Sequence, residues 1–192
     1  KEKVPFKIIE KAQQEWSEYN EANKGENSRR STQETAIQQR TVQVQHESHT
    51  GISLKIHTHQ DRRHAAVGIG ITAIDNLGQL QAAWALRERS SGDTLQDQAV
   101  AVRLALLKVA GQGWRNVKVE LDNRKLVENI TAATYNNQLM ATLIEDIRSI
   151  GTLFQQCSIL FANSRKIGSI KLSIHALNIW LDEEWVNPNF RC

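Results

Sequence analysis

The segment 117–122 constrains the fold of this chain most. Val117 and Val119 alternate with charged residues, which predicts a β-strand with one buried face. Asp122 and Asn123 come next, and Arg124 begins a run typical of a helix start, so the segment predicts a strand end, a helix cap and a helix. Open α/β folds place their chemistry at the carboxyl ends of strands. Asp122 is therefore the first candidate functional residue.

The composition permits one folded domain with an appendage. The chain has 192 residues, 40% hydrophobic and 23% charged, with a formal net charge of +3. This small basic excess is compatible with a nucleic-acid partner without requiring one. Cys157 and Cys192 are the only cysteines, so neither a disulfide framework nor a zinc ligand set is indicated. Because no apolar stretch approaches the roughly 20 residues of a membrane helix, we expect no membrane partner.

The start of the sequence gives an expectation about processing and compartment. The chain begins with Lys1 and its only methionine is Met140, so we interpret it as a processed or excised piece. We expect an intracellular protein, and a processed copy could work in the nucleus, the cytosol or an organelle.

The first 50 residues differ from the rest in composition. Apolar residues recur at helical spacing through residues 1–22, for example Phe6, Ile9 and Trp16, which predicts an amphipathic helix. Residues 23–50 are rich in Gln, Ser, Thr and Asn and predict a polar linker. A helix and linker of this kind favour a protein partner that docks through residues 1–50.

Residues 51–192 are expected to form the folded domain. Alternating runs predict strands near 52–56, 67–73, 80–86, 117–121 and 158–161, and helical spacing predicts helices near 94–109, 124–132, 138–154 and 167–181. The run Asp75-Asn76-Leu77-Gly78 predicts a hairpin turn between the second and third strands. The predicted fold class is α/β, with a five-stranded mixed sheet, three antiparallel strands then two parallel ones, flanked by helices and preceded by the helical extension.

Several runs in this order carry a resemblance to a known family. They are Gly68-Ile69-Gly70-Ile71, Asp75 with Gly78, the run 114–122 that ends in Asp122, Leu126-Val127, the tail 180–188, and the helix around residues 11–16. Together they resemble the ribonuclease H domain of plant reverse-transcriptase-derived (non-LTR retroelement) proteins. Gly68 and Gly70 lie in a predicted strand and not in a phosphate-binding loop.

The resemblance also implies where an active site would lie. Activity in that family rests on four carboxylates around two Mg²⁺ ions, which need several anionic oxygens because the cations repel each other. The four family positions fall on His59, Gln98, Asp122 and Ile170, so Asp122 is the one carboxylate retained. The resemblance therefore implies a degenerate, catalytically silent domain that needs no cofactor, with Mg²⁺ required only if it is active.

Other interpretations of these residues remain open in the sequence. Asp97 and Glu120 could join Asp122 in a rebuilt site, although one residue along a helix turns a side chain by about 100°. His57 and His59 could be zinc ligands together with Asp122, or only exposed strand residues. Asp122 itself could serve only as the helix N-cap.

Nucleic-acid binding needs basic and hydrogen-bonding groups more than metal ligands. Basic side chains could contact phosphates, and Asn123 or Gln98 could reach 2′-hydroxyl groups in a wide minor groove of RNA or an RNA–DNA hybrid. The candidate nucleic-acid-binding residues are Arg62, Arg63, Asn123, Arg124, Lys125, Arg165, Lys166 and Lys171.

Three functions are therefore weighed. The preferred one is a nucleic-acid-binding, inactive ribonuclease H-like module. The first alternative is a structural or assembly subunit docked in a larger complex, with or without RNA. The second is a residual metal-dependent RNA–DNA hybrid ribonuclease.

Overall fold

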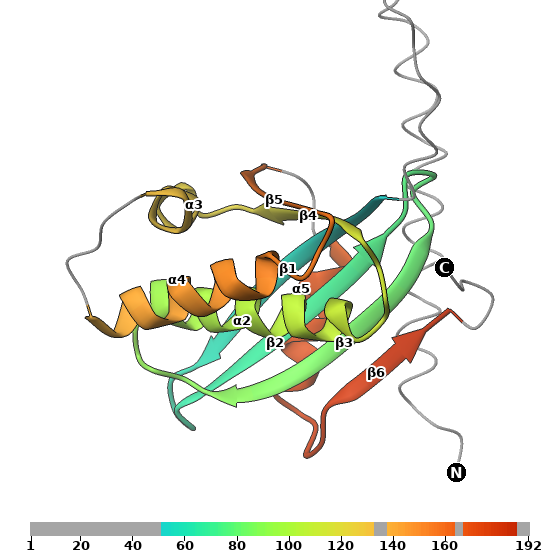
Figure 1. Cartoon of the computed structure of the whole chain (residues 1–192). Coiled ribbons are helices and arrows are strands. Elements are labelled where there is room, and N and C mark those ends of the chain that lie inside the picture. The colour runs from blue at the N-terminus through green and yellow to red at the C-terminus, as the bar shows by residue number, and fades with distance from the viewer. Residues whose placement is uncertain (1–50, 133–137, 164–166, 188–192) are drawn as a thin grey trace, which may run out of the picture. The chain divides into compact units, whose positions relative to one another are not determined.

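The computed structural model describes residues 51–132, 138–163 and 167–187 (Figure 1). The predicted helix at 1–22 and the predicted linker at 23–50 lie outside the described residues, as do Arg165 and Lys166. The described part belongs to one compact unit, Thr50–Cys192. No helix in this part of the chain is long and apolar enough to cross a membrane.

Six strands form one sheet with the order β5-β4-β1-β2-β3-β6. Strands β1, β2 and β3 are antiparallel neighbours, β4 and β5 add in parallel on the side of β1, and β6 is antiparallel to β3. The strands are β1 (Gly51–Asp61), β2 (Ala66–Ile74), β3 (Leu80–Arg89), β4 (Asn116–Leu121), β5 (Gln156–Phe161) and β6 (Glu183–Val186). The helices are α2 (Thr94–Ala110), α3 (Arg124–Thr131), α4 (Gln138–Gly151) and α5 (Ile167–Ala176).

The predicted mixed sheet is confirmed, and the main difference lies at its end. The last helix was predicted to run to residue 181 but ends at Ala176, where Asn178 N donates to His175 O. Strand β6 follows and extends the predicted five strands to six. Only four residues long and half acidic, β6 carries too little hydrophobic alternation to be recognised from its sequence.

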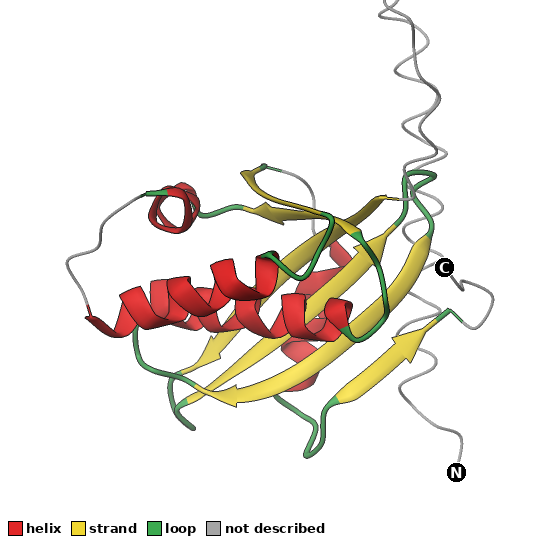
Figure 2. Ribbon diagram, in the orientation of Figure 1, coloured by secondary structure: helices red, strands yellow, loops and turns green. Residues whose placement is uncertain are grey.

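Helices cover both faces of the sheet (Figure 2). Helices α2 and α4 pack on one face over a core that includes Ile52, Trp84 and Leu106. Helix α5 packs on the other face, where Leu172 and Ala176 meet Ala83 and Ala85 of β3. Every residue of the central strand β2 is therefore buried.

Gly68 and Gly70 of β2 allow α5 to lie directly on the sheet. A Cβ at Gly70 would come 1.9 Å from the carbonyl oxygen of Ser169, and one at Gly68 would come 2.0 Å from that of Ser173. These glycines therefore serve the close approach of a helix to a strand, as their position in a strand predicted.

Candidate functional site

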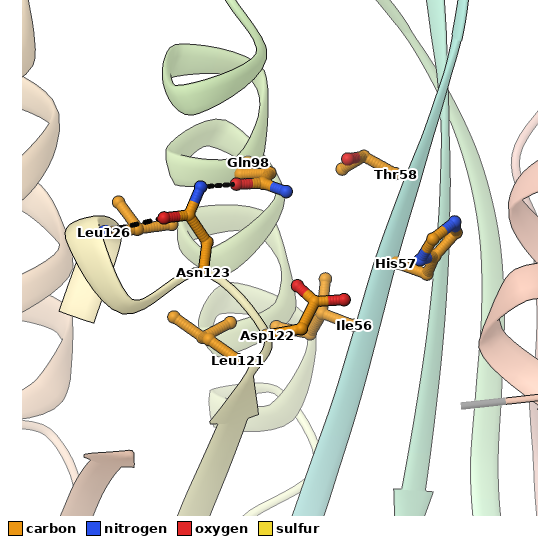
Figure 3. A pocket seen from close by; sticks show the side chains of 8 residues that line it. All are labelled: Ile56, His57, Thr58, Gln98, Leu121, Asp122, Asn123 and Leu126. Carbon is orange, nitrogen blue, oxygen red and sulfur yellow. Dashed lines mark hydrogen bonds between the residues drawn. The ribbon is translucent and has the colours of Figure 1, made fainter. Parts of the chain in front are cut away.

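A small pocket lies where β4 ends beside the middle of β1 and the first turns of α2 and α3 (Figure 3). It combines one carboxylate, two amides, an imidazole and a hydroxyl with an apolar floor. The lining residues are Ile56, His57, Thr58, Gln98, Leu121, Asp122, Asn123 and Leu126. The segment 117–122, from which the sequence argument began, thus supplies the carboxylate of the pocket.

Asn123, and not Asp122, caps helix α3. Asn123 has extended backbone angles, and its Oδ1 accepts a hydrogen bond from Leu126 N at 3.2 Å. The interpretation of Asp122 as the N-cap is therefore wrong. Asp122 is the exposed residue between β4 and this cap, and its carboxylate lines the pocket.

The amides of Asn123 and Gln98 are joined across the pocket. Asn123 Nδ2 donates to Gln98 Oε1 at 2.6 Å, which links the start of α3 to the second turn of α2 (Figure 3). Gln98 is the residue on which the sequence resemblance places the family's helix carboxylate. A neutral amide with this geometry lines the pocket but adds no negative charge beside Asp122.

Asp97, one residue before Gln98, points away from the pocket. Its side chain is 2% exposed and accepts hydrogen bonds from Gln60 Nε2 at 2.7 Å, Ser90 Oγ at 2.6 Å, Ser91 N at 2.8 Å and Ser91 Oγ at 2.7 Å. Burial raises the pKa of Asp97, but these hydrogen bonds outweigh it, so the pKa lies below its ordinary 3.8. Asp97 ties the ends of β1 and β3 to α2 and does not join Asp122.

Glu120 is also committed elsewhere. It is buried, its Oε1 accepts a hydrogen bond from Ser53 Oγ at 3.1 Å, and the same oxygen lies 2.9 Å from Lys118 Nζ. Glu120 is not part of the pocket lining. The rebuilt site of Asp97, Glu120 and Asp122 is therefore not assembled in this structure.

His57 and His59 line two different hollows. They pair across the strands with Gly70 and Gly68, the two glycines beneath α5. His57 lines the pocket of Asp122, whereas His59 is exposed and lines a second hollow beside the C-terminal end of α5. Ile170 lies on α5, partly exposed, and lines neither hollow.

The donor set does not fit the metal ions that the resemblance implies. Among residues 51–132, 138–163 and 167–187, no three His, Cys, Asp or Glu side chains gather closely enough to hold a metal ion. The hypothetical zinc set of His57, His59 and Asp122 is therefore not assembled in the described part of this structure. A pair of Mg²⁺ ions would find one carboxylate here, too few anionic oxygens to balance their charge.

The candidate basic residues come from three places. Arg62 and Arg63 are exposed at the turn between β1 and β2. Arg124 and Lys125 are exposed in the first turn of α3, directly after Asn123, and Arg124 Nε lies 3.3 Å from Glu128 Oε1. Lys171 is half-buried on α5. Of the basic candidates that the structure describes, the pair on α3 is the one that directly adjoins the pocket of Asp122.

Sequence reasoning missed Thr58 in this pocket and Arg87 and Trp180 in the second hollow. Thr58 could have been found from the strand register, because it lies between the two histidines. Strand β3 carries Arg87 to the hollow, and the loop after α5 carries Trp180. That loop was not expected, because helix α5 was predicted to end five residues later than it does.

Solved structures of similar fold include ribonucleases H. Ribonuclease H1 from the halophilic archaeon Halobacterium salinarum superposes with a TM-score of 0.60 at 17% identity, over 67% of this chain and 98% of that one. LC11-RNase H1, isolated from compost by a metagenomic approach, gives 0.59 at 13% identity, over 67% and 96%. Its crystal structure in complex with an RNA/DNA hybrid gives 0.54 at 15% identity, over 66% and 96%. At sequence identities this low, the structural similarity establishes the fold alone.

The sequence comparison defines the family. A search of curated proteins gave no significant match. The profile of the family described as reverse transcriptase-like matches residues 55–167, from β1 to the start of α5, which is more than half of the chain and includes the pocket of Asp122. The chain therefore belongs to the reverse transcriptase-like family, with a ribonuclease H-like fold.

Proposed function

We propose that this domain binds RNA or RNA–DNA hybrid duplexes at the pocket of Asp122 and does not cleave them. The observation that carries the proposal is the pair of amides, Gln98 and Asn123, joined at 2.6 Å beside a single carboxylate. The family membership and the fold support a nucleic-acid ligand, and the compost enzyme of the same fold was crystallised with an RNA/DNA hybrid.

The pocket has groups suited to recognition. Side-chain amides both donate and accept hydrogen bonds, so Asn123 and Gln98 suit the 2′-hydroxyl groups and base edges of a wide, shallow minor groove. Arg124 and Lys125 are exposed beside them and suit the flanking phosphates. Thr58 adds a hydroxyl on the β1 side of the pocket.

The same pocket lacks what cleavage needs. Hydrolysis by the two-metal route requires cations on both the attacking and the leaving oxygen, held by several carboxylates. Gln98 is neutral, and the nearest other carboxylates, Asp97 and Glu120, are engaged by serine, glutamine and lysine side chains. Binding in this proposal needs no metal ion, because the phosphate contacts come from arginine and lysine.

The test combines binding and cleavage of one substrate. A fluorescein-labelled RNA–DNA hybrid is titrated with the protein in EDTA, in Mg²⁺ and in Mn²⁺, and the same samples are run on denaturing gels. Lys125→Ala should weaken binding and reduce the slope of log affinity against log salt by about 1. Arg115→Ala is the matched control, an exposed cation at the opposite end of β4.

Binding in all three buffers without cutting supports the proposal. Metal-dependent cutting that Asp122→Asn abolishes would overturn it and establish a residual ribonuclease. Equal binding by the Lys125→Ala and Arg115→Ala variants would show that the pocket is not the binding site.

An assembly role is the second candidate, and one feature favours it. Strand β5 ends the sheet, and Leu153, Leu160 and Phe161 on and before it are exposed. An open strand edge with apolar side chains can pair with a partner strand. If the chain sediments in a large complex that Leu160→Lys dissociates, while free hybrid is not bound, this second function is the better one.

A further inference from the structure

The second hollow lies on the α5 face of the sheet, beyond the pocket of Asp122. It mixes an aromatic side chain, two imidazoles, a guanidinium, an amide and a carboxylate with apolar side chains in and just after α5. The lining residues are His59, Asp61, His64, Arg87, Ile174, Leu177, Asn178 and Trp180.

Trp180 stands at the rim of this hollow with 96% of its side chain exposed. The loop that carries it is fixed by Arg87. Arg87 Nη1 donates to Leu177 O at 2.9 Å and Ile179 O at 3.4 Å, and Arg87 N donates to Asp182 Oδ1 at 3.2 Å. An indole exposed to water on an anchored loop offers flat, apolar faces on which a base can stack.

The charge around Trp180 selects the kind of ligand. Arg62 and Arg63 are exposed on the turn after β1, and Arg89 is exposed opposite Ala66, where that turn re-enters the sheet. The carboxylates of Asp61 and Asp182 are engaged locally. Asp61 Oδ2 lies 2.6 Å from His64 Nδ1 and Asp61 Oδ1 accepts from Arg63 N at 3.0 Å, while Asp182 Oδ1 accepts from Arg87 N at 3.2 Å. These exposed arginines favour a polyanionic ligand over a protein surface that is neutral or positively charged.

Strand β1 connects the hollow with the proposed duplex site. His57 lines the pocket of Asp122 and His59 lines the hollow of Trp180, and the two residues lie two positions apart on one face of β1. Two residues of a strand span roughly 7 Å, about the spacing of neighbouring nucleotides in an extended strand.

We propose that this hollow binds single-stranded nucleic acid, with an unpaired base stacked on Trp180 and its phosphates held by Arg62, Arg63 and Arg89. The proposal rests on the proposed nucleic-acid-binding function and extends it: the domain would hold a duplex at Asp122 and the single strand that leaves it at Trp180. Stacking on an indole does not depend on which base is present, so binding would be tolerant of sequence.

The experiment measures fluorescence anisotropy of labelled oligo-dT and oligo-U beside a blunt RNA–DNA hybrid. Trp180→Ala should weaken single-strand binding by about 5- to 100-fold, and Trp180→Phe should retain most of it, since stacking contributes strongly for each base. Leu181→Ala is the matched control, because Leu181 is the next residue, 81% exposed, and does not line the hollow. Circular dichroism checks the fold of each variant, and Arg62→Ala with Arg63→Ala provides a second variant on a different segment of the chain.

Each outcome separates this inference from the proposed function. If the blunt hybrid binds and the native chain and the Trp180→Ala variant bind single strands equally well, the stacking site is overturned. The proposed duplex-binding function is then unaffected. No binding of either probe overturns both. Loss of single-strand binding in Trp180→Ala and in the double arginine variant, with blunt-hybrid binding retained, supports the inference.

Discussion

Asn123 Nδ2 donates a hydrogen bond to Gln98 Oε1 at 2.6 Å, while Asn123 Oδ1 accepts one from Leu126 N at 3.2 Å. One side chain thus begins helix α3 and fixes that helix against α2 beside Asp122. The geometry of the proposed binding pocket is therefore held by the same residue that terminates the loop after β4.

This double role can be separated by two substitutions. Asn123→Ala removes both the cap and the contact with Gln98 and should lower the free energy of unfolding by about 1–2 kcal/mol. Asn123→Ser keeps a good N-cap but is too short to reach Gln98, so it should recover about half of that loss. Urea unfolding followed by circular dichroism measures both. Equal losses for the two variants would mean that the contact with Gln98 carries the whole effect.

Because residue 98 is neutral, a single substitution there should create metal binding. Gln98→Glu keeps the shape, still accepts from Asn123, and places a second carboxylate in the pocket of Asp122. Mg²⁺ prefers such oxygens, so about 10 mM Mg²⁺ should raise the melting temperature of Gln98→Glu by roughly 2 °C or more. The native chain should shift by less than about 1 °C under the same conditions.

Gln96→Glu is the control for that experiment, because it adds a carboxylate on the same helix outside the pocket. A Mg²⁺ response as large in Gln96→Glu as in Gln98→Glu would show that added surface charge, and not the pocket, binds the ion.

The sheet could be predicted because its signals are local. Strand β4 alternates valines with charged residues, and the turn after β2 shows Asp75 Oδ1 accepting from Leu77 N and Gln79 N, with Gly78 at a φ of 79°. In these segments the residue types themselves determine the local backbone conformation. The sixth strand and the early end of α5 depend instead on pairing with β3 and on Arg87, which are 90 or more residues away in sequence.

The candidate site was predicted only in part, because some of its residues have local sequence signals and others do not. Asp122 follows from the end of a strand, and the resemblance pointed to Gln98, which shares its pocket. His59 and Ile170 were named with them but do not reach that pocket, because which side chains meet across β1 and α5 depends on register and helix position. Trp180 was noted only as the start of the tail 180–188 and not as a site residue, since its loop was predicted to be helix.

Gly70 predicts a large cost for one added methyl group. A Cβ there would lie 1.9 Å from Ser169 O and 2.6 Å from Ser173 N, both backbone atoms, so α5 must move off the sheet. Gly70→Ala should lower the free energy of unfolding by about 3 kcal/mol or more. Gly151→Ala is the matched control: its Cβ would meet Cys157 Sγ at 3.7 Å, an ordinary contact, so stability should stay equal or rise by about 0.4–1 kcal/mol.

Asp97 predicts how stability changes in acid. Its folded pKa lies below 3.8, so its contribution is present above the unfolded pKa of about 3.9 and is lost as pH falls through the lower folded value. Asp97→Asn should lower the free energy of unfolding at pH 7 by about 1–3 kcal/mol and weaken its pH dependence below about pH 4. Asp93→Asn, which keeps the N-cap of α2, should cost less than about 0.5 kcal/mol. Urea titrations from neutral to acid pH measure these slopes, and identical slopes for the native chain and Asp97→Asn would show that the serine and glutamine donors do not set the charge state of Asp97.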